Sequence, residues 1–83
     1  MYKIRLTAKA ERELKKLSKE DKISIGEIIE ELKENPLIGK TLDRELSKKF
    51  SYRVGIYRII YKVNQKDKIV EILSAGHRRV VYN

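Results

Sequence analysis

The stretch Tyr52–Val63 (YRVGIYRIIYKV) decides the fold of this chain. Glycine as the first of two loop residues is typical of a type II′ turn, so Gly55-Ile56 predicts a β-hairpin. In the register that this turn sets, Arg53 falls directly opposite Arg58, and both side chains point to the same face of the sheet. Like charges in such a pair destabilise a sheet by about 0.2–1 kcal/mol. The hairpin therefore predicts a surface that holds something negatively charged.

A third arginine joins this face only if the next loop has the right length. A three-residue turn, Gln65 to Asp67, would pair Arg58 with Ser74 and bring Arg78 to the same face if the strand continues. A two-residue turn would place Arg78 on the opposite face, because side chains alternate along a strand. The position of Arg78 thus depends on the loop.

The rest of the chain shows a strand, two helices and further strands. Alternating apolar residues predict a strand over Tyr2–Leu6. Apolar residues at helical spacing predict one helix over Ala8–Leu17, with Thr7 as its N-cap. The same spacing predicts a second helix over Lys19–Glu34, which ends before Pro36. Residues 36–49 have little periodicity and are expected to form a loop. Three strands should follow, over Phe50–Val54, Tyr57–Val63 and Ile69–Ala75. This order predicts a single α+β domain, residues 1–83, with a small curved antiparallel sheet.

Composition narrows the class of protein. The chain has 83 residues and no cysteine, so neither disulfides nor thiolate metal sites are expected, and no apolar run is long enough to span a membrane. We expect a cytoplasmic protein. Residues 1–47 hold 11 Lys and Arg against 10 Asp and Glu, whereas residues 48–83 hold 9 against 2. The positive charge therefore lies on the strands, where nucleic acid, an anionic lipid surface or an acidic protein could bind.

The charged residues suit phosphate chemistry without a metal or cofactor. Guanidinium groups match phosphate oxygens in a two-point fork and can stabilise the charge that grows when a 2′-hydroxyl attacks a phosphodiester. The alternative is that each arginine is an ordinary solvated side chain. His77, the only histidine, is a candidate proton carrier or a structural residue, and Tyr82 could stack on a base or be a frayed terminal residue. Lys48 and Lys49 form a solvated pair that could contact phosphate.

Two motifs carry a resemblance. Tyr57-Arg58-x-x-Tyr61 and Gly76-His77-Arg78-Arg79-x-Val81-Tyr82, in this order of elements, resemble the RelE/ParE superfamily of toxins, on the RelE side. The resemblance implies an mRNA interferase that cleaves mRNA in the ribosomal A site. By position it gives catalytic roles to Arg53, Arg58, Arg78 and Tyr82, although Arg53 stands where relatives often have lysine and can hardly act as a base. The expected RNA contacts are Lys48, Lys49, His77 and Arg79.

The resemblance also implies partners. A RelB-like antitoxin would cover the basic face, and the two proteins could form a heterotetramer that binds operator DNA. Two other functions stay open at this point. One is a non-nuclease inhibitor of DNA gyrase of the ParE type, against which the arginine set argues. The other is a degenerate toxin that only binds its antitoxin and DNA.

Overall fold

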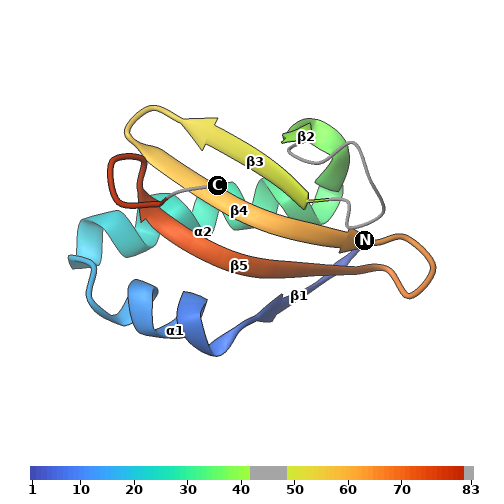
Figure 1. Cartoon of the computed structure of the whole chain (residues 1–83), viewed down its shortest axis with the longest axis horizontal. Helices are drawn as coiled ribbons and strands as arrows, with labels where there is room; N and C mark the ends of the chain where they lie inside the picture. Colours follow the sequence, from blue (N-terminus) through green and yellow to red (C-terminus); the bar gives the residue numbers. More distant parts are fainter. Residues whose placement is uncertain (42–48, 82–83) are drawn as a thin grey trace.

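The computed structural model describes residues 1–41 and 49–81. The elements follow the order β1 (Lys3–Leu6), α1 (Ala8–Lys15), α2 (Lys19–Glu34), a short 3-10 helix η1 (Pro36–Ile38), β2 (Lys40–Thr41), β3 (Lys49–Val54), β4 (Tyr57–Asn64) and β5 (Ile69–His77). The strands form one sheet in the order β1-β5-β4-β3-β2, in which β1 runs parallel to β5 and the other neighbours are antiparallel (Figure 1). The α+β architecture expected from the sequence is confirmed.

Both α-helices begin directly after a residue with a side-chain hydroxyl, which is Thr7 for α1, as predicted, and Ser18 for α2. The Ala10 amide donates to Thr7 Oγ1, and the Asp21 amide donates to Ser18 Oγ, each at 3.1 Å. Such bonds satisfy amides that have no partner inside the helix. α2 has the predicted bounds, whereas α1 ends at Lys15, two residues before the predicted end.

The two hairpins differ in how well the sequence predicts them. The first is confirmed, since Gly55 has a φ of +58° and Arg53 pairs with Arg58. For the second, neither of the two loop lengths considered from the sequence, three residues or two, occurs. Four residues separate Asn64 from Ile69, and a register shift follows between Ile60 and Tyr61, so that Arg58 pairs with Gly76 instead of Ser74.

Side-chain bonds explain the longer loop. The Asp67 amide donates to Asn64 Oδ1 at 3.0 Å, and Asn64 Nδ2 donates to Asp67 Oδ2 at the same distance. These contacts close a turn that uses the asparagine side chain in place of a backbone carbonyl. Lys68 completes it with a φ of +58°.

The segment 36–49 was expected to be a loop, but part of it has regular structure. η1 and β2 occupy residues 36–41 apart from Gly39, and residues 42–48 lie outside the described ranges. Tyr61 ties this segment to the sheet, because its hydroxyl donates to the Pro36 carbonyl at 2.7 Å and accepts from the Gly39 amide at 3.1 Å. Aromatic stacking of Phe50 on Tyr61, with ring centroids 5.3 Å apart, adds to this anchor.

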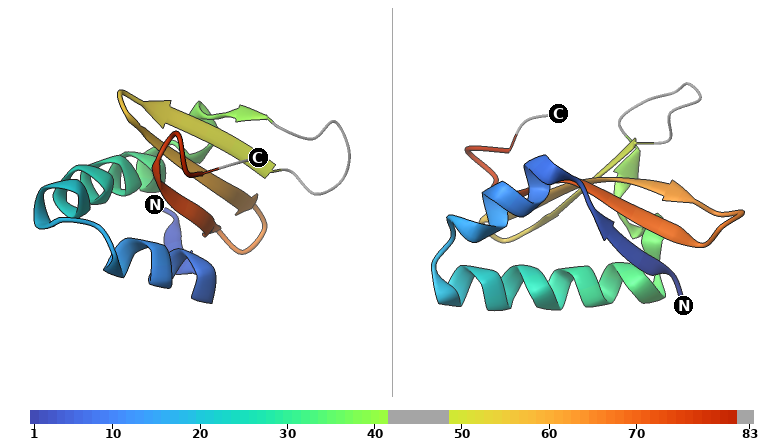
Figure 2. Two further views of the ribbon diagram at one scale, coloured as in Figure 1. Left: turned by 60° about the vertical axis from the view of Figure 1, so that its left-hand side comes forward. Right: turned by 90° about the horizontal axis from the view of Figure 1, so that it is seen from below.

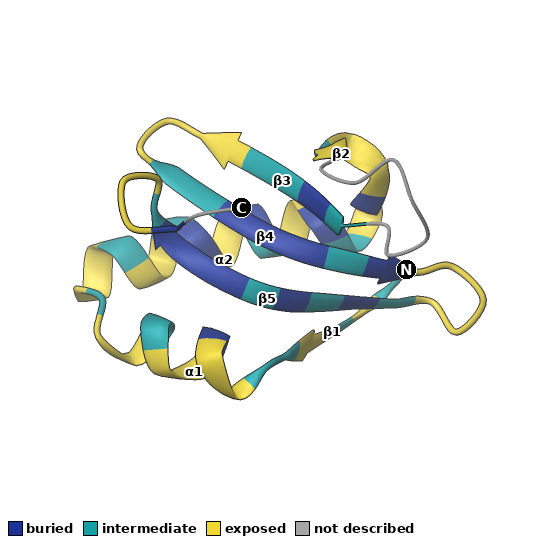
Figure 3. Ribbon diagram, viewed as in Figure 1, coloured by how far each residue is buried: buried dark blue, intermediate teal, exposed yellow. Residues whose placement is uncertain are grey.

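The core lies between the sheet and α2. Figure 2 shows α2 across one face of the sheet, and Figure 3 shows the buried residues running along the middle of β4 and β5. Tyr61, Ile59 and Ile72 point into this layer and are fully buried. On the opposite side of the sheet, which we call the open face, no helix of the described residues lies across the strands (Figure 2).

α1 covers an edge of the sheet that β1 leaves free. β1 pairs with β5 only as far as Ile72, and beyond this point Glu13 of α1 accepts from the Ala75 amide at 3.2 Å and from Ser74 Oγ at 2.8 Å. The carboxylate thereby satisfies a backbone donor that would otherwise be exposed at a strand edge. None of the described helices is long and apolar enough to cross a membrane.

Candidate functional site

The open face of the sheet is strongly basic. The strand register places Arg53 opposite Arg58 and Lys49 opposite Lys62 on this face, because the side chains between them, such as Tyr61, point into the core. The same register adds further residues from the neighbouring strands: Lys3, Arg5 and Lys40 as bases and Glu71 as an acid. On the described strands, the open face therefore carries seven cationic side chains and one carboxylate.

The arginines are free of intramolecular ion pairs within residues 1–41 and 49–81. The ion pairs found there join Lys9 to Glu13, Lys33 to Glu30 and His77 to Asp21, and none of them involves an arginine. Arg53 and Arg78 are exposed and Arg58 is half-buried. No described carboxylate therefore neutralises their charge through an ion pair.

Arg58 carries a buried polar atom. Its Nε makes no hydrogen bond with any residue of 1–41 or 49–81. Directly across the ladder lies Gly76, and Val81, which is 1% exposed, packs over this glycine with its Cγ2 3.5 Å from the position of an added Cβ. A buried donor without an acceptor costs about 1–3 kcal/mol. An oxyanion at the guanidinium edge would remove this cost.

Arg78 reaches the site through a turn instead of through strand register. β5 ends at His77, and the amides of Val80 and Val81 donate to the His77 carbonyl at 2.9 and 3.1 Å. The Arg78 amide donates to the Ile56 carbonyl at 2.7 Å, which joins this C-terminal turn (residues 78–81) to the tip of the β3–β4 hairpin. Figure 2 shows the turn on the side of the sheet opposite α2. Arg78 therefore lies at the hairpin end that also carries Arg53 and Arg58.

His77 is placed apart from the arginines. It pairs with Tyr57 in the ladder and points toward α2, where its Nε2 lies 3.1 Å from Asp21 Oδ2. The Tyr57 hydroxyl donates to the other Asp21 oxygen at 2.6 Å. These two bonds, from Tyr57 first and then from His77, lower the pKa of Asp21 below its usual 3.8. The structure does not bring the imidazole to the open face.

The remaining candidates fall into three groups. Lys49 lies on the open face and is half-buried, and Arg79 is exposed in the C-terminal turn. Lys48 and Tyr82 lie outside the described residues. Four basic residues of this surface were not predicted from the sequence: Lys3, Arg5, Lys40 and Lys62. The alternation in the first strand marks two of them as facing away from the core, but nothing in the sequence shows that this strand adjoins the fifth.

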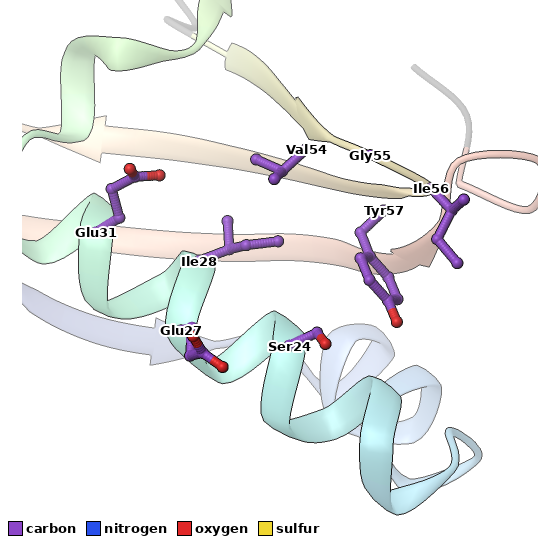
Figure 4. A pocket seen from close by; sticks show the side chains of 8 residues that line it. All are labelled: Ser24, Glu27, Ile28, Glu31, Val54, Gly55, Ile56 and Tyr57. Carbon is purple, nitrogen blue, oxygen red and sulfur yellow. The ribbon is translucent and has the colours of Figure 1, made fainter.

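A groove on the other side of the hairpin has the opposite charge. It lies between α2 and the β3–β4 turn, has a volume of about 470 Å³, and is lined by Ser24, Glu27, Ile28, Glu31, Val54, Gly55, Ile56 and Tyr57 (Figure 4). Glu31 also accepts from the Tyr52 hydroxyl at 2.6 Å, which raises the pKa of Tyr52. Two carboxylates in this groove disfavour a polyanion there, so the open face is the candidate nucleic-acid surface. No cluster of three or more acidic, His or Cys side chains suited to a metal occurs in the described part of the chain.

Comparisons with known proteins identify the family. Residues 4–82 match the family model described as the ParE toxin of the type II toxin-antitoxin system parDE. Toxin RelG of Mycobacterium tuberculosis is 37% identical over 83 residues, which cover 98% of this chain and 95% of that protein.

Solved structures agree with this result. The crystal structure of the RelBE2 toxin-antitoxin complex from Mycobacterium tuberculosis contains a chain that is 38% identical, with a TM-score of 0.83, and the match covers 93% of this chain and 98% of that one. A chain of the archaeal RelE-RelB complex from Pyrococcus horikoshii is 26% identical, with a TM-score of 0.80 and coverage of 96% and 98%. The protein therefore belongs to the ParE toxin family of type II toxin-antitoxin systems, within the RelE/ParE superfamily.

Proposed function

We propose that this toxin is a ribosome-dependent mRNA endoribonuclease that cleaves without a metal. The observation that supports this most is the set of arginines at one end of the open face, which form no ion pair with any described residue, together with the buried Arg58 Nε, which has no acceptor among those residues. A gyrase-binding protein has no need for guanidinium groups held ready for phosphate. A nuclease that relies on charge stabilisation has this need.

The reaction is an attack by the 2′-hydroxyl on the neighbouring phosphorus. The 2′-oxygen forms a bond to phosphorus and loses its proton, the bond to the 5′-oxygen breaks, and that oxygen takes up a proton. The products are a 2′,3′-cyclic phosphate and a 5′-hydroxyl end. In this proposal Arg53 and Arg58 hold the non-bridging oxygens, Arg78 stabilises the charge on the leaving side, and Tyr82 positions the attacking sugar. Lys48, Lys49 and Arg79 contact the flanking RNA backbone.

The side chains of the open face support the proposed dependence on the ribosome. His77 points toward α2, so no described side chain on that face has an ordinary pKa near neutrality. In this proposal catalysis comes from charge stabilisation and from holding the sugar and phosphate in line. Orientation alone can supply about 7–11 kcal/mol of the barrier in favourable cases. An mRNA codon held in the A site is presented in a fixed geometry, which a free RNA strand lacks. The protein would act in the cytoplasm.

A RelB-like antitoxin is the proposed inhibitor. Two of the matched structures are complexes of a toxin with its antitoxin. An acidic or amphipathic segment laid on the open face would neutralise it and exclude RNA. Assembly of two toxins with two antitoxins, in a complex that binds operator DNA, is part of the same proposal.

The test is cleavage of mRNA on programmed ribosomes. Arg58→Gln and Arg78→Gln should each lower the single-turnover rate by about 100-fold or more, the usual effect of removing one group that stabilises transition-state charge. Arg12→Gln, which removes an exposed arginine from α1, is the matched control and should cleave normally. Cleavage that survives both substitutions, or equal cleavage of free RNA, would refute the proposal.

One observation favours a second function. The matching family model carries the description of a ParE toxin, so inhibition of DNA gyrase is the alternative. A supercoiling assay with purified gyrase separates the two functions, because the nuclease proposal predicts no inhibition.

A further inference from the structure

A cluster of three side chains ties together three elements that meet beside the site. Asp21 comes from the first turn of α2, Tyr57 from the start of β4 and His77 from the end of β5. Asp21 accepts from Tyr57 at 2.6 Å and lies 3.1 Å from His77 Nε2. Because an ionised carboxylate can only accept, the imidazole must donate through Nε2. The rings of Tyr57 and His77 also lie close, with centroids 5.6 Å apart.

His77 connects this cluster to the C-terminal turn through its own backbone. The side chain is held on the α2 side of the sheet, while the carbonyl of the same residue accepts the amides of Val80 and Val81 on the way to the open face. The residue before it, Gly76, still lies in β5 but has a φ of +156°, a conformation that side-chain-bearing residues rarely adopt. The orientation of one residue thus determines where the turn begins.

The Arg78 side chain has no other anchor in the described residues. It is exposed and makes no ion pair, so its position depends on the backbone, which is held by the Ile56 carbonyl at one point and by the His77 turn at the other. Rotation of His77 would displace both the turn and the guanidinium that it carries. A displacement of 1 Å at a reacting group can lower a rate by about 100-fold.

We propose that His77, held by Asp21 and Tyr57, is a positioning residue that sets the location of Arg78 at the phosphate without itself touching RNA. This role rests on the proposed nuclease function. It differs from the roles that the sequence suggested for His77, as a proton carrier or an RNA contact, because the imidazole acts from the far side of the sheet.

The first experiment separates positioning from binding. His77→Leu removes the donor and should lower the rate constant of cleavage on the ribosome by about 10- to 100-fold, with the KM for programmed ribosomes changed by less than about threefold. His77→Gln can still donate to Asp21 and should recover most of the lost rate. A proton carrier would not be rescued by glutamine, and an RNA contact would raise KM, so either result would overturn the proposal.

Two tyrosines offer a matched control. Tyr57→Phe and Tyr52→Phe each remove one phenol bond of 2.6 Å from the sheet to a carboxylate of α2, but only Tyr57 bonds the carboxylate that holds His77. Tyr57→Phe should lower the cleavage rate, and Tyr52→Phe should leave it unchanged. Equal effects of the two would show a general contribution of these bonds to stability and would contradict a positioning role.

A second measurement does not depend on nuclease activity. Hydrogen exchange of the Val80 and Val81 amides reports the bonds to the His77 carbonyl directly. His77→Leu should speed exchange at these two amides, and His77→Gln should restore protection. Lost protection in a protein that never cleaves RNA would uphold the positioning role and reject the nuclease. Unchanged protection would reject the positioning role whatever the activity.

Discussion

Arg53 and Arg58 face each other across the β3–β4 ladder, and neither forms an ion pair with any described residue. A cross-strand pair of like charges costs about 0.2–1 kcal/mol, which nothing on this face of the described structure offsets. Active sites often keep such unfavourable arrangements because ligand binding relieves them. The pair therefore links stability and activity in opposite directions.

Replacement of Arg53 tests this link. Arg53→Gln should raise the free energy of unfolding by about 0.2–1 kcal/mol, because the repulsion disappears, and should lower cleavage on ribosomes. Urea denaturation and a single-turnover cleavage assay measure the two effects. Arg12→Gln should change the free energy of unfolding by no more than a few tenths of a kcal/mol and should leave the cleavage rate unchanged. Lower stability together with normal cleavage in Arg53→Gln would contradict the assignment.

Gly76 offers a test of the turn that carries Arg78. Gly76→Ala should cost about 1–3 kcal/mol, because alanine tolerates the φ of +156° poorly. Gly26→Ala is the control within α2, where no atom lies within 4 Å of an added Cβ, and it should stabilise the protein by about 0.5–1 kcal/mol. Thermal unfolding of the two variants measures both changes in stability. If both substitutions stabilise the protein, or both destabilise it, the explanation based on the φ of Gly76 is disproved.

Loss of the Tyr61 hydroxyl should destabilise the fold more than loss of the Tyr52 hydroxyl. Tyr61→Phe leaves the Pro36 carbonyl without its donor and the Gly39 amide without its acceptor, which should cost about 1–3 kcal/mol in denaturant unfolding. Tyr52→Phe should cost less, because the Glu31 carboxylate that it leaves behind is exposed to water. Similar losses in the two variants would be inconsistent with this reasoning.

Tyr61 should also make the folding stability depend on pH in the alkaline range. Burial raises the pKa of Tyr61 from 10.0 to about 12. The folded protein therefore keeps this proton after the unfolded chain has lost it, so its contribution to stability is complete below pH 10 and disappears as the pH rises toward 12. Unfolding measured across this range should show a loss of stability that is smaller in Tyr61→Phe. An identical decline in both proteins would argue against the buried phenol.

Asp21 should make the folding stability depend on pH in the acid range. The bonds from Tyr57 and His77 lower its pKa, so the unfolded chain binds a proton first as the pH falls. Its contribution to stability is present above pH 3.8 and is lost as the pH drops through the lower value of the folded state. The difference in Tm between the wild type and Asp21→Asn should therefore shrink below pH 3.8. A constant difference between pH 5 and pH 2 would rule out this contribution.

Local signals in the sequence were sufficient for part of the fold. Gly55 and Ile56 specify a turn of fixed length, so the pairing of Arg53 with Arg58 follows by counting. The α2 helix has a hydroxyl residue before it and a proline after it, and its bounds were predicted correctly. In these cases the determinants lie within a few residues of the feature.

Features that depend on distant contacts were missed. The register shift near Ile60 and the parallel pairing of β1 with β5 are set by packing, which no local pattern encodes. The direction of His77 depends on that shift, and its partner Asp21 lies far away in the sequence. The sequence could therefore indicate which residues carry charge, but not which side of the sheet the imidazole takes.

The parallel pairing of β1 with β5 affects how the chain can fold during its synthesis. Lys3 pairs with Ile69, so β1 gains its neighbour in the sheet only after the chain has been synthesised through β5. Contacts between such distant residues form late in folding. Since the turn bearing Arg78 follows the same β5 strand, the three arginines cannot come together in a nascent chain until residues 69–81 have been synthesised.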